Sequence, residues 1–197
     1  MAVAELASQQ KLLVVVVPSS ASAAALEREL PLFSSAPLNI LTLPDWETLP
    51  YDNFSPHQDI VSERLATFHQ LQDIATGILI VPITTLMQRT PPVHYVAGNS
   101  LVLDVGQALD SKTLIHNLTL NGYRAVDTVY EHGEYAVRGS LLDIFPMGSQ
   151  APYRIDLFDA EIETLRSFDP ETQRTINKVE SVRQLPAREL PPPEQRI

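Results

Sequence analysis

The stretch YRIDLFDAEIETL (residues 153–165) has the pattern of a β-strand that ends in a turn and leads into a second strand. Side chains of a strand point alternately to its two faces, and one face here is apolar: Tyr153, Ile155 and Leu157. The other face carries Arg154, Asp156 and Phe158. A cation beside an aromatic ring is typical of binding hot spots rather than of a plain outer face. The pattern predicts a sheet with one face left for a partner.

The rest of the second half has a similar pattern. Three further segments have strand patterns with turn-forming residues between them: 125–146, 161–169 and 176–185. A strand at 101–105 and a helix at 111–123, which Asp110 or Ser111 begins, precede them. We therefore expect an α+β unit with an antiparallel sheet.

The first half alternates apolar strands with helices. Strand patterns lie at 11–20, 38–44 and 77–82, and helical patterns lie at 20–30, at 56–72 and from residue 83 onward. Strands that are apolar on both faces and separated by helices indicate a parallel sheet that helices cover on both sides.

These patterns divide the 197 residues into two domains and a tail. We expect an α/β domain at residues 1–97, a small α+β domain at residues 98–186 and a proline-rich linker at residues 187–197. Residues 11–23 also imitate a signal peptide, because an apolar run precedes small residues there. The run is short and no cationic cluster precedes it, so a buried strand is the better interpretation. We expect a cytoplasmic protein with no membrane partner.

Charge and cysteine content exclude several function classes. The formal net charge is −10, whereas phosphate binding depends on clustered lysines and arginines, so direct DNA binding by this chain is not expected. The chain has no cysteine, which excludes disulfides, thiol nucleophiles and zinc knuckles and fits a reducing compartment.

The turn after the first strand tests for nucleotide chemistry. It reads VVPSSASAAALE, without the glycines that let backbone N–H groups approach a phosphate and without the lysine that meets its charge. Its serines are better helix caps than anion ligands. We expect no nucleotide hydrolysis by these residues.

Two acidic clusters are candidates for a catalytic or metal site. Glu131, His132 and Glu134 could hold a metal, but a strand sends alternate side chains to opposite faces, so a hairpin or bulge is favoured. The run Asp156, Asp159, Glu161 and Glu163 could supply an acid and a base, but a solvated edge and turn is the commoner meaning. We expect no catalytic residue, no metal and no cofactor.

Three long blocks carry a family resemblance. Residues 43–71, 77–92 and 131–175 together resemble the N-terminal region of bacterial transcription-repair coupling factors, and the third block also resembles the excision-repair helicase UvrB. The resemblance implies a degenerate helicase-like α/β domain, without a phosphate loop, followed by a small domain that binds UvrA. UvrB also has an aromatic DNA-clamping hairpin, for which this chain offers no candidate.

The resemblance implies a non-catalytic role. The chain would recruit UvrA to stalled RNA polymerase, while contacts to RNA polymerase and DNA, and the ATP-dependent motor, would belong to later domains of a longer protein. The alternative is a fragment of a UvrB-type nucleotide-dependent repair enzyme. The missing Gly-Lys loop argues against that alternative.

The family's UvrA-contacting residues match Arg138, Arg154 and Phe158. Arg154 and Phe158 are four apart in a strand and share a face, about 13 Å apart. We expect Arg138 on the preceding strand, paired with this one through the MGSQAP turn; the register is not readable, because LLDIF is apolar on both parities.

A purely structural interpretation stays open for two of these residues. Arg154 could pair with Asp143 or Asp156, and Phe158 could fold under the EIETL segment as core.

Overall fold

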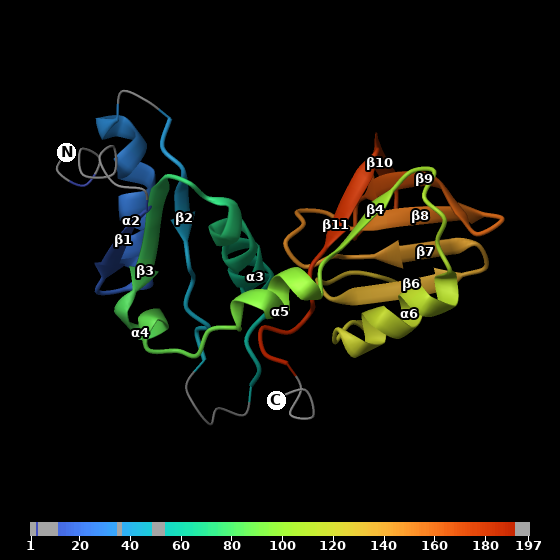
Figure 1. Cartoon of the computed structure of the whole chain (residues 1–197), viewed down its shortest axis with the longest axis horizontal. Coiled ribbons are helices and arrows are strands. Elements are labelled where there is room, and N and C mark those ends of the chain that lie inside the picture. The colour runs from blue at the N-terminus through green and yellow to red at the C-terminus, as the bar shows by residue number, and fades with distance from the viewer. Residues whose placement is uncertain (1–2, 4–11, 35–36, 49–53, 192–197) are drawn as a thin grey trace. The chain divides into compact units, whose positions relative to one another are not determined.

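The computed structural model describes residues 3, 12–34, 37–48 and 54–191, and it divides into two compact units at residues 1–90 and 91–197. The sequence patterns place the domain boundary a few residues later, between 97 and 98. Figure 1 shows the elements of both units. The predicted linker is described only to residue 191, and within that part Ala187 is buried and donates its backbone N–H to the carbonyl of Asn121.

The first unit is built on a three-stranded parallel sheet in the order β1-β3-β2. Its elements, in chain order, are β1 (Leu12–Val17), α2 (Ser20–Glu29), η1 (Leu30–Phe33), β2 (Ile40–Thr42), α3 (Gln58–Asp73), β3 (Gly77–Pro82) and α4 (Ile83–Leu86). The strand predicted at residues 11–20 is present as β1 but ends at Val17, because Ser19 caps α2 and Ser20 begins it; residue 11 lies outside the described residues. Ser19 caps α2 by accepting a hydrogen bond from the N–H of Ser22, as the sequence indicated.

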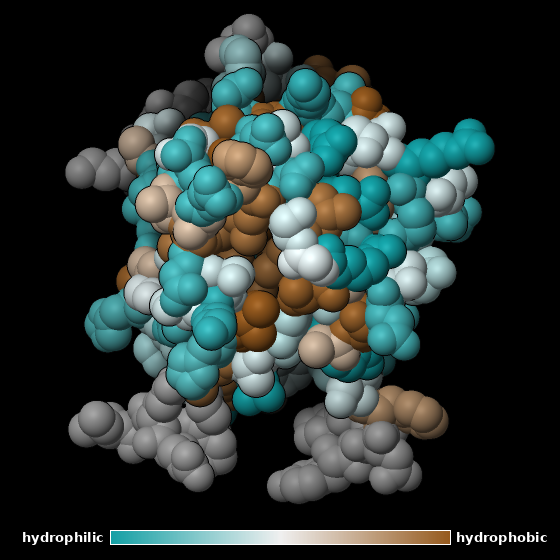
Figure 2. Space-filling model, turned by 90° about the vertical axis from the view of Figure 1, so that its right-hand side faces the viewer, coloured by the Kyte–Doolittle hydropathy of each residue, from teal (hydrophilic) through white to brown (hydrophobic). Residues whose placement is uncertain are grey.

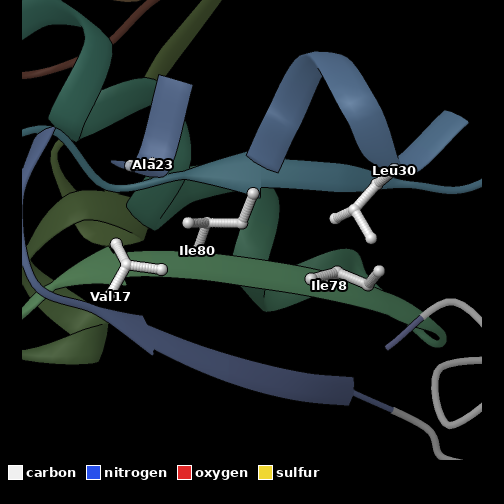
Figure 3. Packing of buried hydrophobic residues seen from close by; sticks show 5 residues of the cluster. All are labelled: Val17, Ala23, Leu30, Ile78 and Ile80. Atoms are coloured by element: carbon white, nitrogen blue, oxygen red, sulfur yellow. The ribbon is translucent and has the colours of Figure 1, made fainter. Parts of the chain in front are cut away.

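Two apolar clusters hold this unit together. On one side of the sheet, Val17, Ile78 and Ile80 pack with Ala23 of α2 and with Leu30 (Figure 3). On the other side, Leu79 and Val81 pack with Phe68 and Leu71 of α3.

The sequence predicts that helices cover both faces of this sheet, and this prediction is wrong for one face of β1. Leu12, Val14 and Val16 are 37%, 49% and 46% exposed, because the cluster beneath α3 involves β3 and β2 and leaves this face of β1 out.

The second unit contains a six-stranded sheet in the order β10-β9-β8-β7-β6-β5 and a two-stranded sheet of β11 and β4. Its elements are α5 (Val93–Gly98), β4 (Leu101–Asp104), α6 (Ser111–Leu120), β5 (Arg124–Ala125), β6 (Glu134–Arg138), β7 (Leu141–Ile144), β8 (Tyr153–Phe158), β9 (Glu161–Phe168), β10 (Thr175–Val179) and β11 (Ser181–Gln184). All neighbouring strands are antiparallel except β5 and β6, which are parallel. The predicted antiparallel sheet is confirmed.

Two faces of the large sheet differ in character. One carries Tyr135, Leu142 and Ile155, and α6 lies on this side, because the hydroxyls of Thr119 and Tyr135 are 3.1 Å apart. On the opposite face, a small apolar core is formed by Val129, Ala136, Phe145 and Phe168. Polar side chains lie next to this core on the same face. Asp110 caps α6 by accepting hydrogen bonds from the N–H groups of Lys112 and Thr113.

In the part of the chain that the structure describes, no helix is long and apolar enough to cross a bilayer.

Candidate functional site

A buried carboxylate organises the polar face of the large sheet. Asp143 on β7 is 1% exposed and accepts two hydrogen bonds from Arg154, 2.7 Å from Nε to Oδ1 and 2.9 Å from Nη2 to Oδ2. It accepts a third from Nη2 of Arg138, at 2.6 Å. One carboxylate therefore holds two guanidinium groups side by side, in the charge-assisted geometry that makes such bonds short and strong.

The structure brings Arg138 and Arg154 together, but not through direct strand pairing. Arg138 ends β6, whereas β7 lies between β6 and β8, so the expected pairing of Arg138's strand with β8 is wrong. The chain reverses at Gly139, whose φ of 65° allows a two-residue hairpin. The MGSQAP turn then joins β7, not β6, to β8.

Arg154 is fixed by contacts on two sides. Its guanidinium lies over the ring of Phe168, 4.9 Å from the centroid, and its side chain is 18% exposed. The hydrogen bond to Asp143 raises the pKa of Arg154 above its usual value, although partial burial opposes this shift. The predicted alternative in which Arg154 pairs with Asp143 is thus what the structure shows. Such a pairing orients the guanidinium at the surface of the sheet.

Phe158 is exposed rather than folded into a core. It ends β8, is 66% exposed and lies on the same face as Arg154 and Asp156. A two-residue turn follows, in which Asp159 and Ala160 both have positive φ. The interpretation of Phe158 as ordinary core is wrong, because β8 ends and β9 begins at this turn and no described residue covers the ring.

The polar face extends beyond the three predicted residues. On β9, Nη2 of Arg166 donates to Oδ2 of Asp156 at 3.3 Å, and both side chains are between a quarter and a third exposed. The sequence alone does not predict Arg166 as a site residue, because it does not reveal the register between β8 and β9. The sequence signal for Arg166 is strand alternation, which puts Thr164 and Arg166 on one face of β9. The pairing of β9 with β8 makes this the face of Arg154 and Asp156.

The cluster at residues 131–134 is structural. Glu134 is buried and accepts hydrogen bonds from the N–H groups of Tyr130 and Glu131 and from Arg124. His132 instead places its ring 3.9 Å from that of Phe145 and its Nε2 2.8 Å from the carbonyl of Ser149. These side chains do not converge, and among the described residues no group of three or more acidic or histidine side chains could hold a metal ion.

This cluster makes stability depend on pH. Burial pushes the pKa of Glu134 upward, but the hydrogen bonds from Tyr130, Glu131 and Arg124 outweigh it and hold the pKa below 4.5. A carboxylate whose pKa is lower in the folded protein than in the unfolded chain stabilises the fold at pH values above its unfolded-state pKa. This stabilisation is lost as the pH falls through its folded-state pKa. We expect urea unfolding, followed by circular dichroism, to shift to lower urea below pH 4.5.

The matched pair for this prediction is Glu134→Gln and Glu131→Gln. Glu131 is largely exposed, and its contact with Arg124 is long, at 3.4 Å, so it contributes little to stability. Its variant should therefore unfold like the parent at every pH. Glu134→Gln should be less stable at neutral pH and lose less on acidification. Equal acid sensitivity in parent and Glu134→Gln would contradict this account.

A hollow lies at the end of the sheet where the hairpins turn. It is lined mostly by apolar side chains, with the first residues of α6 at its rim: Leu109, Asp110, Ser111, Val137, Gly139, Ser140, Leu141, Leu142, Leu157 and Ala160. Figure 2 shows this end of the second unit, with apolar residues grouped among hydrophilic ones. Val137, Leu142 and Leu157 lie on the α6 side of the sheet, so the hollow is on the opposite face from Arg154 and Phe158.

Comparison with known proteins assigns the second unit to a described family. Residues 101–190 match the UvrB interaction domain. The chain is 50% identical over 190 residues to the transcription-repair-coupling factor of Escherichia coli (strain K12), a match that covers 96% of this chain and 16% of that protein. It is 48% identical over 192 residues to the factor of Haemophilus influenzae, covering 97% of the chain and 17% of the relative.

A more distant relative gives the same result over a shorter match. The factor of Bacillus subtilis (strain 168) is 32% identical over 132 residues, or 67% of this chain. The chain spans about a sixth of the length of the first two relatives, and the matching model describes an interaction domain rather than a catalytic one. By these comparisons the chain matches the N-terminal region of the transcription-repair-coupling factors over nearly its whole length, and its residues 101–190 match the UvrB interaction domain.

Proposed function

We propose that this chain binds UvrA and, within a longer protein, recruits it to stalled RNA polymerase. One observation carries the proposal: Asp143 holds the guanidinium groups of Arg138 and Arg154 together on a sheet face that also presents the exposed ring of Phe158. Paired guanidinium donors beside a desolvatable aromatic ring form the kind of anchor that dominates protein interfaces.

The two units have different parts in this proposal. Residues 98–186 are the UvrA-binding domain, and residues 1–97 are a degenerate helicase-like domain that scaffolds it without binding nucleotide. The turn after β1 supports this division, because Ser19 uses its hydroxyl to cap α2 and the segment lacks the glycines and lysine of a phosphate loop. Contacts with RNA polymerase and DNA would come from other parts of the longer protein.

Competition between this chain and UvrB tests the proposal. Because residues 101–190 match the UvrB interaction domain, the chain and UvrB should use one surface of UvrA. In a fluorescence anisotropy titration, unlabelled UvrB should displace the labelled chain from UvrA completely. Simultaneous binding of both, or no binding of a folded chain, would show that the proposed function is wrong.

A further inference from the structure

Three basic side chains lie next to one another across three strands of the large sheet. The strand register pairs Arg154 of β8 with Arg166 of β9, and Arg166 with Lys178 of β10. We call Arg154, Arg166 and Lys178 the cation row. Neighbouring strands are about 4.8 Å apart, so the three Cα atoms span roughly 10 Å. Asp143 of β7 pairs with Arg154 from the neighbouring strand on the other side of β8, so it lies directly beside the row.

This arrangement is not what stability alone would favour. Like charges directly opposite each other on adjacent strands destabilise a sheet. One row of residues paired across the strands contains Asp143, Arg154, Arg166 and Lys178. The adjacent row contains Arg138 and Asp156. Together the two rows hold four cations and two carboxylates, an excess of two positive charges. The excess is local, because the whole chain carries −10.

The cations are held less tightly toward the sheet edge. Arg154 has two short bonds to Asp143 and lies on Phe168. Arg166 has one bond of 3.3 Å to Asp156, and its buried Nε has no hydrogen-bond acceptor among the described residues. Lys178 is exposed, and no ion pair of its ammonium group occurs in the described part of the chain. Arg166 and Lys178 are thus the side chains that can turn to an outside anion at little cost.

We propose that the docking face extends over β9 and β10, and that Arg166 and Lys178 there bind carboxylates on an acidic protein surface. This inference rests on the proposed function, because the partner that carries the carboxylates is then UvrA. Arg138, Arg154 and Phe158 form the fixed part of the face, and the outer cations set its charge preference.

An acidic protein fits this row better than a nucleic acid. Two of the row's neighbours are carboxylates already engaged by arginines, so a phosphate backbone would meet only a two-charge excess on a chain of −10. Nucleic-acid affinity grows with the number of phosphates neutralised, and two contacts give little. Carboxylates on a protein surface need only a small patch of positive charge opposite them, and such complementary charge also speeds association.

A charge reversal at the edge of the row tests the inference. Lys178→Glu should weaken binding of UvrA about tenfold and reduce its salt dependence, whereas Lys178→Arg should bind like the parent. The matched control is Lys112→Glu, which makes the same charge change on α6, on the other side of the sheet. Affinities are measured by calorimetric titration at two salt concentrations, and each protein is also titrated with a labelled DNA duplex.

The outcomes separate this inference from the function on which it rests. Weaker binding by Lys178→Glu but not by Lys112→Glu supports the extended face. Equal affinities of these two variants overturn the extension and leave the proposed function standing. Binding of the DNA duplex by the parent, lost in Lys178→Glu, also overturns it, because the row would then be a phosphate surface. Absence of UvrA binding by the folded parent overturns the proposed function and this inference together.

Discussion

Replacing Asp143 with asparagine is expected to lower the free energy of unfolding of the second unit by about 3 kcal/mol. Asparagine has nearly the same shape, but it lacks the charge that three hydrogen bonds from Arg138 and Arg154 require. Arg154 would be left largely buried without its counter-charge, which is the costly way to break a buried pair. Urea unfolding followed by circular dichroism, with amide exchange of β7 and β8 to locate the change, measures the effect.

The control is Asp156→Asn on the neighbouring strand. Asp156 is partly exposed and 3.3 Å from Arg166, so its loss should cost less than about 1 kcal/mol. Equal losses in the two variants would show that Asp143 does not organise the face.

A double variant separates the stabilising role of Arg154 from its docking role. Replacing a buried ion pair with apolar residues of similar volume is often close to neutral for stability. Asp143→Leu combined with Arg154→Met should therefore fold about as stably as the parent but should not bind UvrA. Parent-like affinity in the stable double variant would remove Arg154 from the docking face.

Replacing Phe158 with alanine is expected to weaken UvrA binding by about thirtyfold, or about 2 kcal/mol, without loss of stability. The ring is 66% exposed at the end of β8, so the folded chain loses little when it is removed. In a complex the ring would be desolvated beside the paired guanidinium groups, which is where anchors contribute most. Calorimetric titration gives the affinity.

The matched control for Phe158 is Phe54→Ala. Phe54 is 78% exposed in the first unit, so its variant removes the same side chain from a surface without a proposed role. The Phe54 variant should bind like the parent. A similar loss in both variants would mean that the effect of Phe158→Ala is not specific to the docking face.

The sequence predicted the elements that have strong local signals. The strand at 153–158 and the turn after it follow from alternation and from the small or polar residues that allow positive φ. The caps of α2 and α6 follow from Ser19 and Asp110. In each case a few neighbouring residues determine the result.

The sequence failed where the result depends on distant residues. The β6–β7 hairpin lies inside a run that reads as continuous strand, and only Gly139 marks its turn. Because Leu141, Leu142 and Ile144 are apolar on both parities, the sequence could not show which face Asp143 occupies. The exposed face of β1 depends on which strands α3 covers, and no local pattern contains that information.

Photo-crosslinking from position 158 tests the central claim most directly. A benzophenone amino acid in place of Phe158 lies on the proposed docking face, and the same substitution at Leu120, which is 52% exposed on α6, lies on the other side of the sheet. With UvrA present, irradiation should give a crosslink to UvrA from position 158 and little from position 120. A crosslink from position 120 with none from position 158, in chains that bind UvrA normally, would show that UvrA contacts the opposite side of this domain.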